Sequence, residues 1–457
     1  EIKDYRDLKN KYNSIASIEM IEAVGQNYLE SYFKTMNKKI IFLQLNEFNL
    51  DLLKKKAFDN NLVNLQKIFD LDFYEYECDA TEEHKGLDPW VQWVNINTGK
   101  RYHEHNLREM GESSNLKFNQ IWDILSDNNI TTGVWGTMNA KNNNKSNNLV
   151  FLPDPWNDKQ ICNPNYLKNI FDLPSYMLKN FMDFSILKFL KLTGNFIFTL
   201  IRSGVIFTLI LKSSFIFKFI VKKGINKYYL YSIFDWVSFI LFIKLKKKYN
   251  LDFSIYFLNT LASTQHRVWN KDDKGKEIDF TFLVLDRIMA EIYKFKNEKI
   301  IIASGLSQKK LDYKYYHYRP KNPEKFFKKI GFEKFDLRQN MSNDGFLYFD
   351  NDINYNNALK TFSNLKIDKK LVFQFEDRLV NNQKCIFFIL DVNHFIKENT
   401  YIEINEKKFL FFDFFNLDVI RTGEHTPICN TFTNIEFNTK DKYNCDIFDQ
   451  IKLFYQI

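Results

Sequence analysis

The sequence predicts an α/β protein: a three-layer sandwich with a mainly parallel sheet, a helical lid insertion and a small C-terminal sheet subdomain. The first observation behind this prediction is that continuous apolar runs of strand length alternate with segments of helical spacing. Residues 38–45 read KKIIFLQL, as expected of a parallel strand that is buried on both faces. The second observation is that polar residues directly follow these runs, at the edge of the sheet where ligands bind in such folds.

The same patterns place each element in chain order. Strands are expected at 38–45, 72–78, 131–135, 253–258 and 299–303, and helices at 62–69, 88–98, 117–126, 280–295, 323–330 and 356–365. We expect residues 37–165 and 251–319 to form the two parts of the α/β core, with the insertion at 166–250 between them. Residues 320–457 should form a C-terminal α+β subdomain that completes the site, and residues 1–36 are a segment apart from the rest.

Composition limits the function classes. Lys and Arg number 64 against 56 Asp and Glu, which gives a net charge of +8 spread over 457 residues, so nucleic-acid binding is not favoured. The five cysteines are scattered without CxxC spacing, which argues against a disulfide framework and a structural zinc site. Only 14 glycines are present, and none form a nucleotide-type phosphate loop. We expect a cytoplasmic protein, with peripheral contact at the inner membrane as an alternative.

The first 36 residues carry a separate signal. The stretches SIEMIEAVG (17–25) and YLESYF (28–33) resemble cyclopropane-fatty-acid synthases and related S-adenosylmethionine methyltransferases. The glycine-rich cofactor loop of that family does not accompany them. We interpret this segment as a fragment of foreign origin, and a methyltransferase activity is the weakest of three functional readings.

Four strand ends and a late turn form a recognisable series. The segments are LNE (45–47), DPWVQWVNINTG (88–99) followed by HEH (103–105), NTLASTQH (259–266), SGLSQ (304–308) and TGEHTP (422–427). In order and spacing they resemble the alkaline phosphatase superfamily, in its type I phosphodiesterase and sulfatase-like branch. The resemblance covers about residues 38–457. It implies a phosphoester or sulfoester hydrolase or transferase that works with metal ions held by carboxylates and imidazoles.

Carried over position by position, the resemblance implies metal ligands at Glu47 (or Asn46), Asn259 and His425. His266, three residues beyond the position expected for a histidine, is a further candidate ligand. Catalytic roles are expected for Asp88, Gln92 and His105, and substrate contacts for Asn46, Gln265, Ser307 and Gln308. Glu47 could equally cap the following helix, and Asp88 before Pro89 is also the pattern of an N-cap followed by the first helical residue. His105 could instead be a helix-capping or surface histidine, and His266 could equally be a packed histidine beside Trp269.

The motifs depart from the family pattern at three positions. The nucleophile would fall at Pro89, a histidine is replaced by Ser263, and an Asp-His pair is replaced by Gly305-Leu306. The sequence therefore does not support a two-metal site. One divalent ion, zinc or manganese, bound by Glu47 or Asp88 with His266 and His425 remains open, and so does a site without metal.

The insertion at 166–250 is rich in Phe, Ile and Leu and is punctuated by Lys and Arg. Its apolar run at 192–211 has the length of a membrane span, but Arg202 lies at its centre. Three arrangements follow: helices that cap the core, an interfacial helix pair at a membrane surface, or a true span. We expect a lid over the cleft that suits a small anionic or lipid-linked substrate.

Two main readings of function result. The first is a divergent hydrolase or transferase acting on an anionic sugar-, nucleotide- or lipid-linked phosphoester. The second is a catalytically degenerate protein that keeps the pocket to bind such a ligand in envelope polysaccharide metabolism. The replaced nucleophile favours the second reading, whereas His266 and His425 favour the first.

Overall fold

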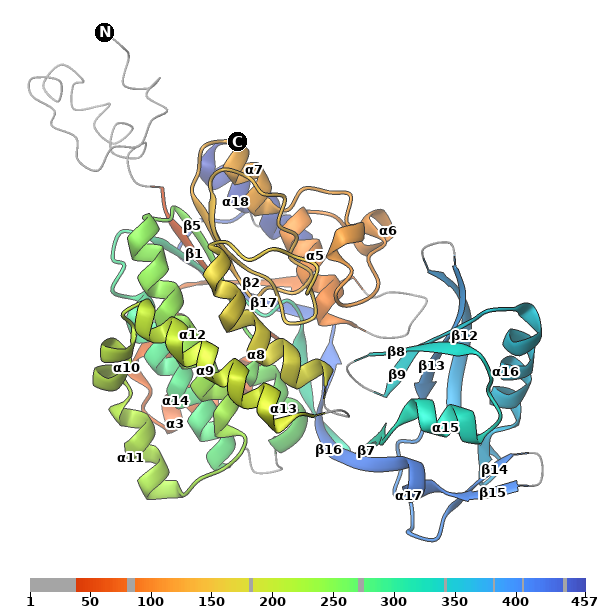
Figure 1. Cartoon of the computed structure of the whole chain (residues 1–457). Coiled ribbons are helices and arrows are strands. Elements are labelled where there is room, and N and C mark those ends of the chain that lie inside the picture. The colour runs from red at the N-terminus through yellow and green to blue at the C-terminus, as the bar shows by residue number, and fades with distance from the viewer. Residues whose placement is uncertain are drawn as a thin grey trace, which may run out of the picture.

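A seven-stranded sheet forms the centre of the larger domain (Figure 1). The structure is a computed structural model that describes residues 38–79, 87–180, 184–269, 275–340, 343–380, 383–404, 407–438 and 442–457. The interpretation of residues 1–36 therefore lies outside the described residues. The strand order is β2-β17-β6-β1-β5-β3-β4, and β17 alone runs against the others. The strands are β1 (Ile40–Leu45), β2 (Asp72–Glu77), β3 (Thr132–Trp135), β4 (Asn148–Leu152), β5 (Phe253–Leu258), β6 (Lys299–Ala303) and β17 (Ile428–Thr433).

Strand β1 shows why the apolar runs are continuous. All six of its residues are buried, because helices cover both faces of the sheet. Ile41, Leu43 and Leu45 belong to one hydrophobic cluster, whereas Ile40 and Phe42 belong to another on the opposite face. Successive side chains of a strand point to opposite faces, so both sets must be apolar. The predicted three-layer α/β sandwich is confirmed.

The two helical layers differ in size. The thinner layer contains α5 (Pro89–Thr98), α7 (Ile121–Asp127) and α18 (Ile447–Tyr455), all of which contribute to the second cluster. The thicker layer contains α3 (Leu50–Asp59), α4 (Val63–Gln66), α8 (Lys168–Lys179), α12 (Tyr229–Tyr249), α13 (Thr260–Val268) and α14 (Lys276–Ile292). The short helix α6 (Tyr102–His105) follows α5.

The insertion adds three helices to the thicker layer. They are α9 (Ile186–Arg202), α10 (Ile206–Lys212) and α11 (Ser214–Lys223), and each places apolar side chains in the core cluster. In the described part of the chain, no single helix has the length and apolar character needed to cross a membrane. Helices α9 and α10 together would pass that test, but they meet at an angle of 91°.

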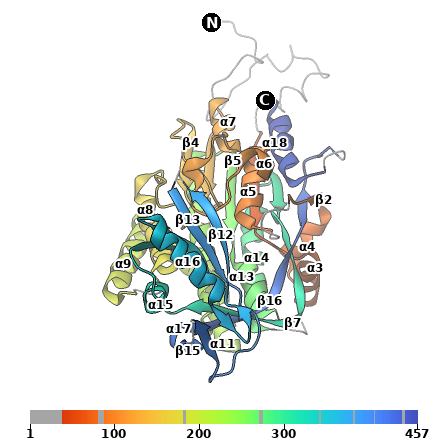
Figure 2. The same cartoon turned by 90° about the vertical axis from the view of Figure 1, so that its right-hand side faces the viewer.

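A ribbon of two long strands, β7 (Ser307–Pro320) and β16 (Phe415–Thr426), leads to the C-terminal subdomain (Figures 1 and 2). The core of that subdomain is built largely from phenylalanines, such as Phe327, Phe362 and Phe388, whose rings pack against one another. Its elements are α15 (Pro323–Lys329), α16 (Asp352–Asn364), α17 (Phe411–Phe414), β8 (Phe335–Gln339), β9 (Asp344–Phe349), β10 (Lys366–Ile367), β11 (Lys370–Leu371), β12 (Phe373–Val380), β13 (Gln383–Leu390), β14 (Tyr401–Ile404) and β15 (Lys407–Leu410).

Two sequence expectations about local structure were wrong. Helix α3 and strand β4 were not expected, because a short amphipathic helix and a strand within an Asn-rich stretch give weak periodic signals. The segment that follows β5 was expected to be a loop that opens into the cleft. It forms helix α13, with His266 in its last turn.

Candidate functional site

Strand β1 delivers Asn46 and Glu47 to the carboxyl edge of the sheet. The backbone N–H of Asn46 donates to Leu258 of β5, and that of Glu47 donates to Ser304 after β6, at 3.0 and 2.8 Å. Glu47 adopts φ 60°, a left-handed conformation that costs a residue with a side chain about 1 kcal/mol or more. Such a cost at the end of a buried strand is typical of a functional position, and it turns the carboxylate toward helix α13.

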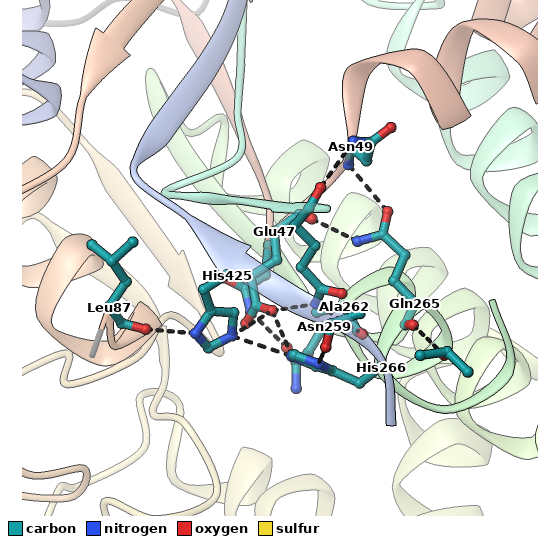
Figure 3. A network of polar contacts seen from close by, with 12 residues as sticks. Glu47, Asn49, Leu87, Asn259, Ala262, Gln265, His266 and His425 are labelled. Carbon is teal, nitrogen blue, oxygen red and sulfur yellow. Dashed lines mark hydrogen bonds and ion pairs between the residues drawn. The ribbon is translucent and has the colours of Figure 1, made fainter. Parts of the chain in front are cut away.

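Three side chains from distant parts of the chain meet at this point (Figure 3). Glu47 Oε2 lies 3.0 Å from His266 Nε2 and 3.1 Å from His425 Nε2, and the two Nε2 atoms are 3.2 Å apart. Glu47 is buried, but the side chains of His266 and His425 keep 23% and 25% of their surface exposed. The cluster is therefore rigid on the protein side and open to a ligand on the other.

The tautomers of the two histidines follow from their other nitrogens. His266 Nδ1 lies 3.0 Å from the carbonyl oxygen of Gly423, and His425 Nδ1 lies 2.5 Å from that of Leu87. A carbonyl oxygen only accepts, so each Nδ1 must carry the hydrogen and donate it. In the neutral imidazoles, both Nε2 lone pairs then point at each other and at the carboxylate. Three converging electron-rich atoms need a cation between them, either a shared proton or a metal ion.

Neighbouring amides hold the carboxylate in place. Gln308 Nε2 donates to Glu47 Oε2, and Asn46 Nδ2 donates to Glu47 Oε1 at 2.9 Å. Gln265 Nε2 donates to the carbonyl oxygen of Glu47 at 2.7 Å. Asn259 accepts from Asn46 Nδ2 at 2.8 Å. These four amides orient Glu47 without adding charge to the site.

Helix α13 and strand β16 are fixed against each other beside the cluster. Thr422 Oγ1 donates to the carbonyl oxygen of Gln265 at 2.7 Å and accepts from the backbone N–H of Trp269 at 3.0 Å. A Cβ at Gly423 would lie 2.5 Å from Gln308 Oε1 and 3.0 Å from the carbonyl oxygen of Gln265. The glycine in TGEHTP thus permits the close approach that brings His266 and His425 together.

The charges of the cluster stabilise one another. Burial raises the pKa of Glu47, but the two imidazoles outweigh this effect and hold the pKa well below its usual range. Burial lowers the pKa of His425, but the Glu47 carboxylate outweighs it, so that this pKa is raised. Without a metal ion, the carboxylate and the protonated form of His425 therefore stabilise each other.

The three ligand atoms suit one divalent metal ion, since two imidazoles with one carboxylate is a known zinc-ligand set. Zinc bonds of about 2.0–2.1 Å in a tetrahedron would separate the ligand atoms by about 3.3 Å. The observed separations of 3.0, 3.1 and 3.2 Å are close to that spacing. Both imidazoles also donate their other N–H to a carbonyl oxygen, which is the usual support for a metal-bound histidine. The residues present therefore fit a metal ion.

A second ion would find poor ligands at this edge. Asn46 and Asn259 are neutral amides that already bond to each other, and Gly305-Leu306 offer no ligating side chain. Among the described residues, Glu47, His266 and His425 form the group of acidic and imidazole side chains that could hold an ion.

Asp88 lies at the beginning of α5, close enough to His425 and Glu47 to feel their charges. Its side chain makes no capping hydrogen bond, so the capping alternative is not what the structure shows. Burial raises the pKa of Asp88 to about 6, and the protonated His425 partly offsets this effect. The carboxyl group is thus present in both protonation states near neutral pH.

The structure does not bring Gln92 and His105 to the cluster. Gln92 is fully buried and bonds to the backbone of Asp79 and to Asn444. His105 Nδ1 accepts from the Leu107 N–H, and its Nε2 lies 2.7 Å from the Asn95 side chain. Burial lowers the pKa of His105 to about 4, so it stays neutral. Both side chains serve local structure, and the catalytic roles expected for them have no geometric support.

Of the four residues expected to contact the substrate, three lie at the cluster and Ser307 does not. Ser307 is buried and donates to the carbonyl oxygen of Phe48 at 2.8 Å, so it joins the ribbon to the sheet edge instead of facing a ligand. Asn46, Gln265 and Gln308 all contact Glu47, as described above. Their position supports the carboxylate, and the roles expected for them remain predictions.

Sequence reasoning missed three arginines beside the cluster. Arg267 follows His266 on α13, and Arg319 and Arg421 come from β7 and β16. Asp418 lies 3.6 Å from Arg267 and from Arg319, so one carboxylate pairs with two guanidinium groups, and its charge also acts on Arg421. Burial lowers the pKa of the nearby His317 to about 2, and the positive charges of the three arginines add to this effect. No sequence signal could have found this group, because it depends on the pairing of β7 with β16.

Several solved structures are similar to this chain. Phosphonoacetate hydrolase from Sinorhizobium meliloti 1021, in complex with phosphonoacetate, has 11% identity and a TM-score of 0.42, with 92% of this chain and 96% of that chain covered. Alkaline phosphatase from the Antarctic bacterium TAB5 has 10% identity and a TM-score of 0.39, with 92% and 98% covered. Murine ectonucleotide pyrophosphatase/phosphodiesterase 5 has 10% identity and a TM-score of 0.42, with 92% and 95% covered.

At this level of identity the likeness concerns the fold, and the function has to be sought in the site itself.

The sequence comparisons concern the N-terminal part. The family described as mycolic acid cyclopropane synthetase matches residues 1–42, which agrees with the resemblance seen in that segment. No curated protein matches the chain.

Proposed function

We propose that this chain binds one divalent metal ion through Glu47, His266 and His425 and acts on an anionic phosphoester, as a hydrolase or transferase. The observation that carries the proposal is the convergence of Glu47 Oε2 and the two Nε2 lone pairs on one point. This point lies beyond the carboxyl ends of β1 and β5, where ligands bind in parallel sheets. A metal ion held there would polarise a phosphoryl oxygen of the substrate.

The arginine group supports an anionic substrate. Arg267, Arg319 and Arg421 are half-buried, and one carboxylate offsets only part of their charge. Burial lowers the pKa of Arg421, so this guanidinium gains from any anion that approaches it. Guanidinium groups bind phosphate and sulfate oxygens with two parallel hydrogen bonds. We expect these side chains to orient the part of the substrate that does not react.

Asp88 is the proposed proton-transfer group. Its pKa of about 6 allows it to give or take a proton near neutral pH. It lies at the N-terminus of α5, where the helix dipole favours a negative charge on the substrate. Glu47 and the histidines keep their positions through the backbone carbonyl and amide contacts described above.

The competing proposal is a binding protein without turnover. It is favoured by Asp88-Pro89 at the position where the family resemblance places a hydroxyl nucleophile. Such a protein would use the same metal and arginines to hold an anionic sugar, nucleotide or lipid headgroup. Its metal content would be the same as that of an enzyme, so only turnover distinguishes the two.

The experiment combines metal analysis with an ester assay. The purified full chain is loaded with zinc or manganese, and metal content is measured together with hydrolysis of bis-4-nitrophenyl phosphate and 4-nitrophenyl sulfate. An enzyme should lose metal and turnover in His425→Ala, and turnover alone in Asp88→Asn. His103→Ala, which removes an exposed imidazole outside the cluster, is the matched control. Metal binding without turnover of either ester would favour the binding protein, and a chain that binds no metal would refute both proposals.

A further inference from the structure

Helices α9, α10 and α11 carry an unusual amount of exposed apolar surface. More than half of the large apolar side chains that are exposed in the described part of the chain lie between Met177 and Tyr231. In the insertion helices they are Ile186, Leu187, Leu190, Ile197, Phe198, Ile201, Phe207, Ile210, Leu211, Phe217 and Val221. We call these eleven residues the apolar face. Contiguous exposed patches of this kind mark an interaction site in a folded protein.

Helix α9 is apolar on both sides. Phe196 and Leu200 are buried in the core cluster, whereas Leu190, Phe198 and Ile201 are each more than half exposed. An ordinary surface helix turns polar residues to water on the side that does not pack. This helix needs a second apolar environment that the rest of the described chain does not supply.

The charge around the apolar face has one sign. Residues 184–234 contain eight Lys and Arg and no Asp or Glu. Lys212 pairs with Glu291 of α14, at 2.6 Å. The other seven are exposed: Lys188, Lys191, Arg202, Lys218, Lys222, Lys223 and Lys227. Apolar residues interleaved with exposed basic ones are typical of helices that lie in the headgroup region of an anionic membrane.

The three helices are fixed to the domain beneath them. Phe219 of α11 packs on Phe280 of α14, with ring centroids 5.0 Å apart, and Phe215 packs edge-on against Trp236 of α12. Together with the Lys212–Glu291 pair, these contacts fix α10 and α11 to the domain, at whose edge Figure 1 shows them. The 91° bend between α9 and α10 suits helices that lie on a surface.

We propose that the apolar face and its basic residues dock this chain peripherally onto an anionic lipid bilayer. A second copy of the chain is a poorer occupant, because a symmetric contact would bring the same basic residues against each other with no carboxylate between them. An anionic bilayer satisfies both features at once, since acyl chains accept the apolar side chains and the headgroups neutralise the lysines. The proposal stands apart from the metal site and does not depend on it.

Vesicle co-sedimentation of the purified full chain tests the proposal. We expect binding to phosphatidylcholine vesicles that contain phosphatidylglycerol, weaker binding at high salt, and little binding to phosphatidylcholine alone. Leu187→Glu with Phe207→Glu should weaken binding by about tenfold or more. Lys218→Gln with Lys222→Gln should weaken it by roughly tenfold as well. The matched control is Ile353→Glu with Leu379→Glu, which changes equally exposed apolar residues of the C-terminal subdomain.

A label reports where the chain touches the bilayer. All five natural cysteines are buried, so Phe207→Cys would supply an accessible thiol for an environment-sensitive dye. Its emission should shift to the blue when anionic vesicles are added, while a dye on Leu379→Cys should not respond. The proposal is overturned if wild type does not bind anionic vesicles, or if the control pair weakens binding as much as the insertion variants. A blue shift at position 207 that follows protein concentration without vesicles would also overturn it, in favour of self-association.

Discussion

Replacing Glu47 by Gln is the sharpest test of the metal site. The substitution keeps the shape of a buried side chain and removes its negative charge. Glu47 is the one anionic ligand of the group, so we expect its loss to weaken metal binding at least as much as the loss of an outer-shell partner does, roughly a hundredfold in affinity.

The same substitution changes the protons that metal binding releases. In the wild type, Glu47 raises the pKa of His425, so a metal ion must displace a proton from this imidazole at pH values below the raised pKa. Without the carboxylate, only Asp88 and the carbonyl of Leu87 oppose the effect of burial, so the pKa of His425 falls from its wild-type value. Glu47→Gln should therefore bind zinc more weakly and release fewer protons near neutral pH.

Titration calorimetry with zinc in buffers of different ionisation enthalpy measures both quantities. Glu424→Gln is the control, because this residue adjoins His425 in sequence but pairs with Lys309 at 2.9 Å instead. The reasoning is wrong if Glu47→Gln binds zinc within threefold of the wild-type affinity. It is equally wrong if both proteins release the same number of protons.

The pair also links stability to pH in the metal-free protein. The pKa of His425 is higher in the folded protein than in the unfolded chain. It therefore stabilises the fold fully at pH values below the unfolded-chain pKa, and this stabilisation is lost as pH rises through the folded-state pKa. The pKa of Glu47 is lower in the folded protein than in the unfolded chain. It therefore stabilises the fold at pH values above the unfolded-chain pKa, and this stabilisation is lost as pH falls through the folded-state pKa. Urea unfolding of the apoprotein should therefore show a stability maximum between these limits that zinc broadens toward higher pH.

Three further predictions concern other parts of the domain. Gly305→Ala should destabilise the fold by about 1–3 kcal/mol in thermal unfolding, because φ is +73° and a Cβ would lie 2.6 Å from the Trp93 ring. Gly194→Ala should instead stabilise the fold by up to about 1 kcal/mol, because Gly194 lies within α9 and its Cβ would meet no other atom. Burial raises the pKa of Asp235 to about 7, so ionising this carboxyl lowers the free energy of unfolding as pH rises above the pKa that Asp has in the unfolded chain. In urea unfolding, Asp235→Asn should exceed the wild type in free energy of unfolding by roughly 2–3 kcal/mol more at pH 7 than at pH 5. Arg421→Gln should weaken binding of inorganic phosphate to the metal-loaded protein about tenfold or more, with metal content unchanged; an unaltered phosphate affinity would remove the arginine group from the proposed site.

Much of the fold was predictable because burial on both faces leaves a plain signal. Strands β5 and β6 have the bounds that their apolar runs predicted, since all their residues except Ser254 and Lys299 are apolar. Helix α3 was missed because only one face of its ten residues is buried. The insertion was recognisable by composition, but its bend and packing depend on contacts with α12 and α14.

The site residues were predictable where ionisable side chains follow the end of a strand. Glu47 and His266 follow β1 and β5, and parallel strands necessarily bring such residues to one edge. His425 comes from a strand of the ribbon, and its glycine-flanked turn was the clue. The contact of His105 with Asn95 was not predictable, because Asn95 lies on a different helix and no local pattern reveals that pairing.

The charges of the site fit one another in a way that bears on how many metal ions it holds. Two dications would need several carboxylates to offset their charge, but the second position offers the neutral amides of Asn46 and Asn259. The cluster instead places a single carboxylate, Glu47, beside two imidazoles, which suits one dication. If the chain acts as proposed above, Arg267, which follows His266, and Arg421, which feels the charge of Glu47, would supply the positive charge that a second ion would have given to an anionic substrate. Guanidinium groups stay charged without carboxylate ligands, so replacing an ion by arginine removes the need for acidic residues there. On this view Asn46 and Asn259 can be neutral because the arginines, not a second metal ion, bind the anionic substrate. A substrate without a negatively charged oxygen should therefore bind poorly whether or not the metal is present.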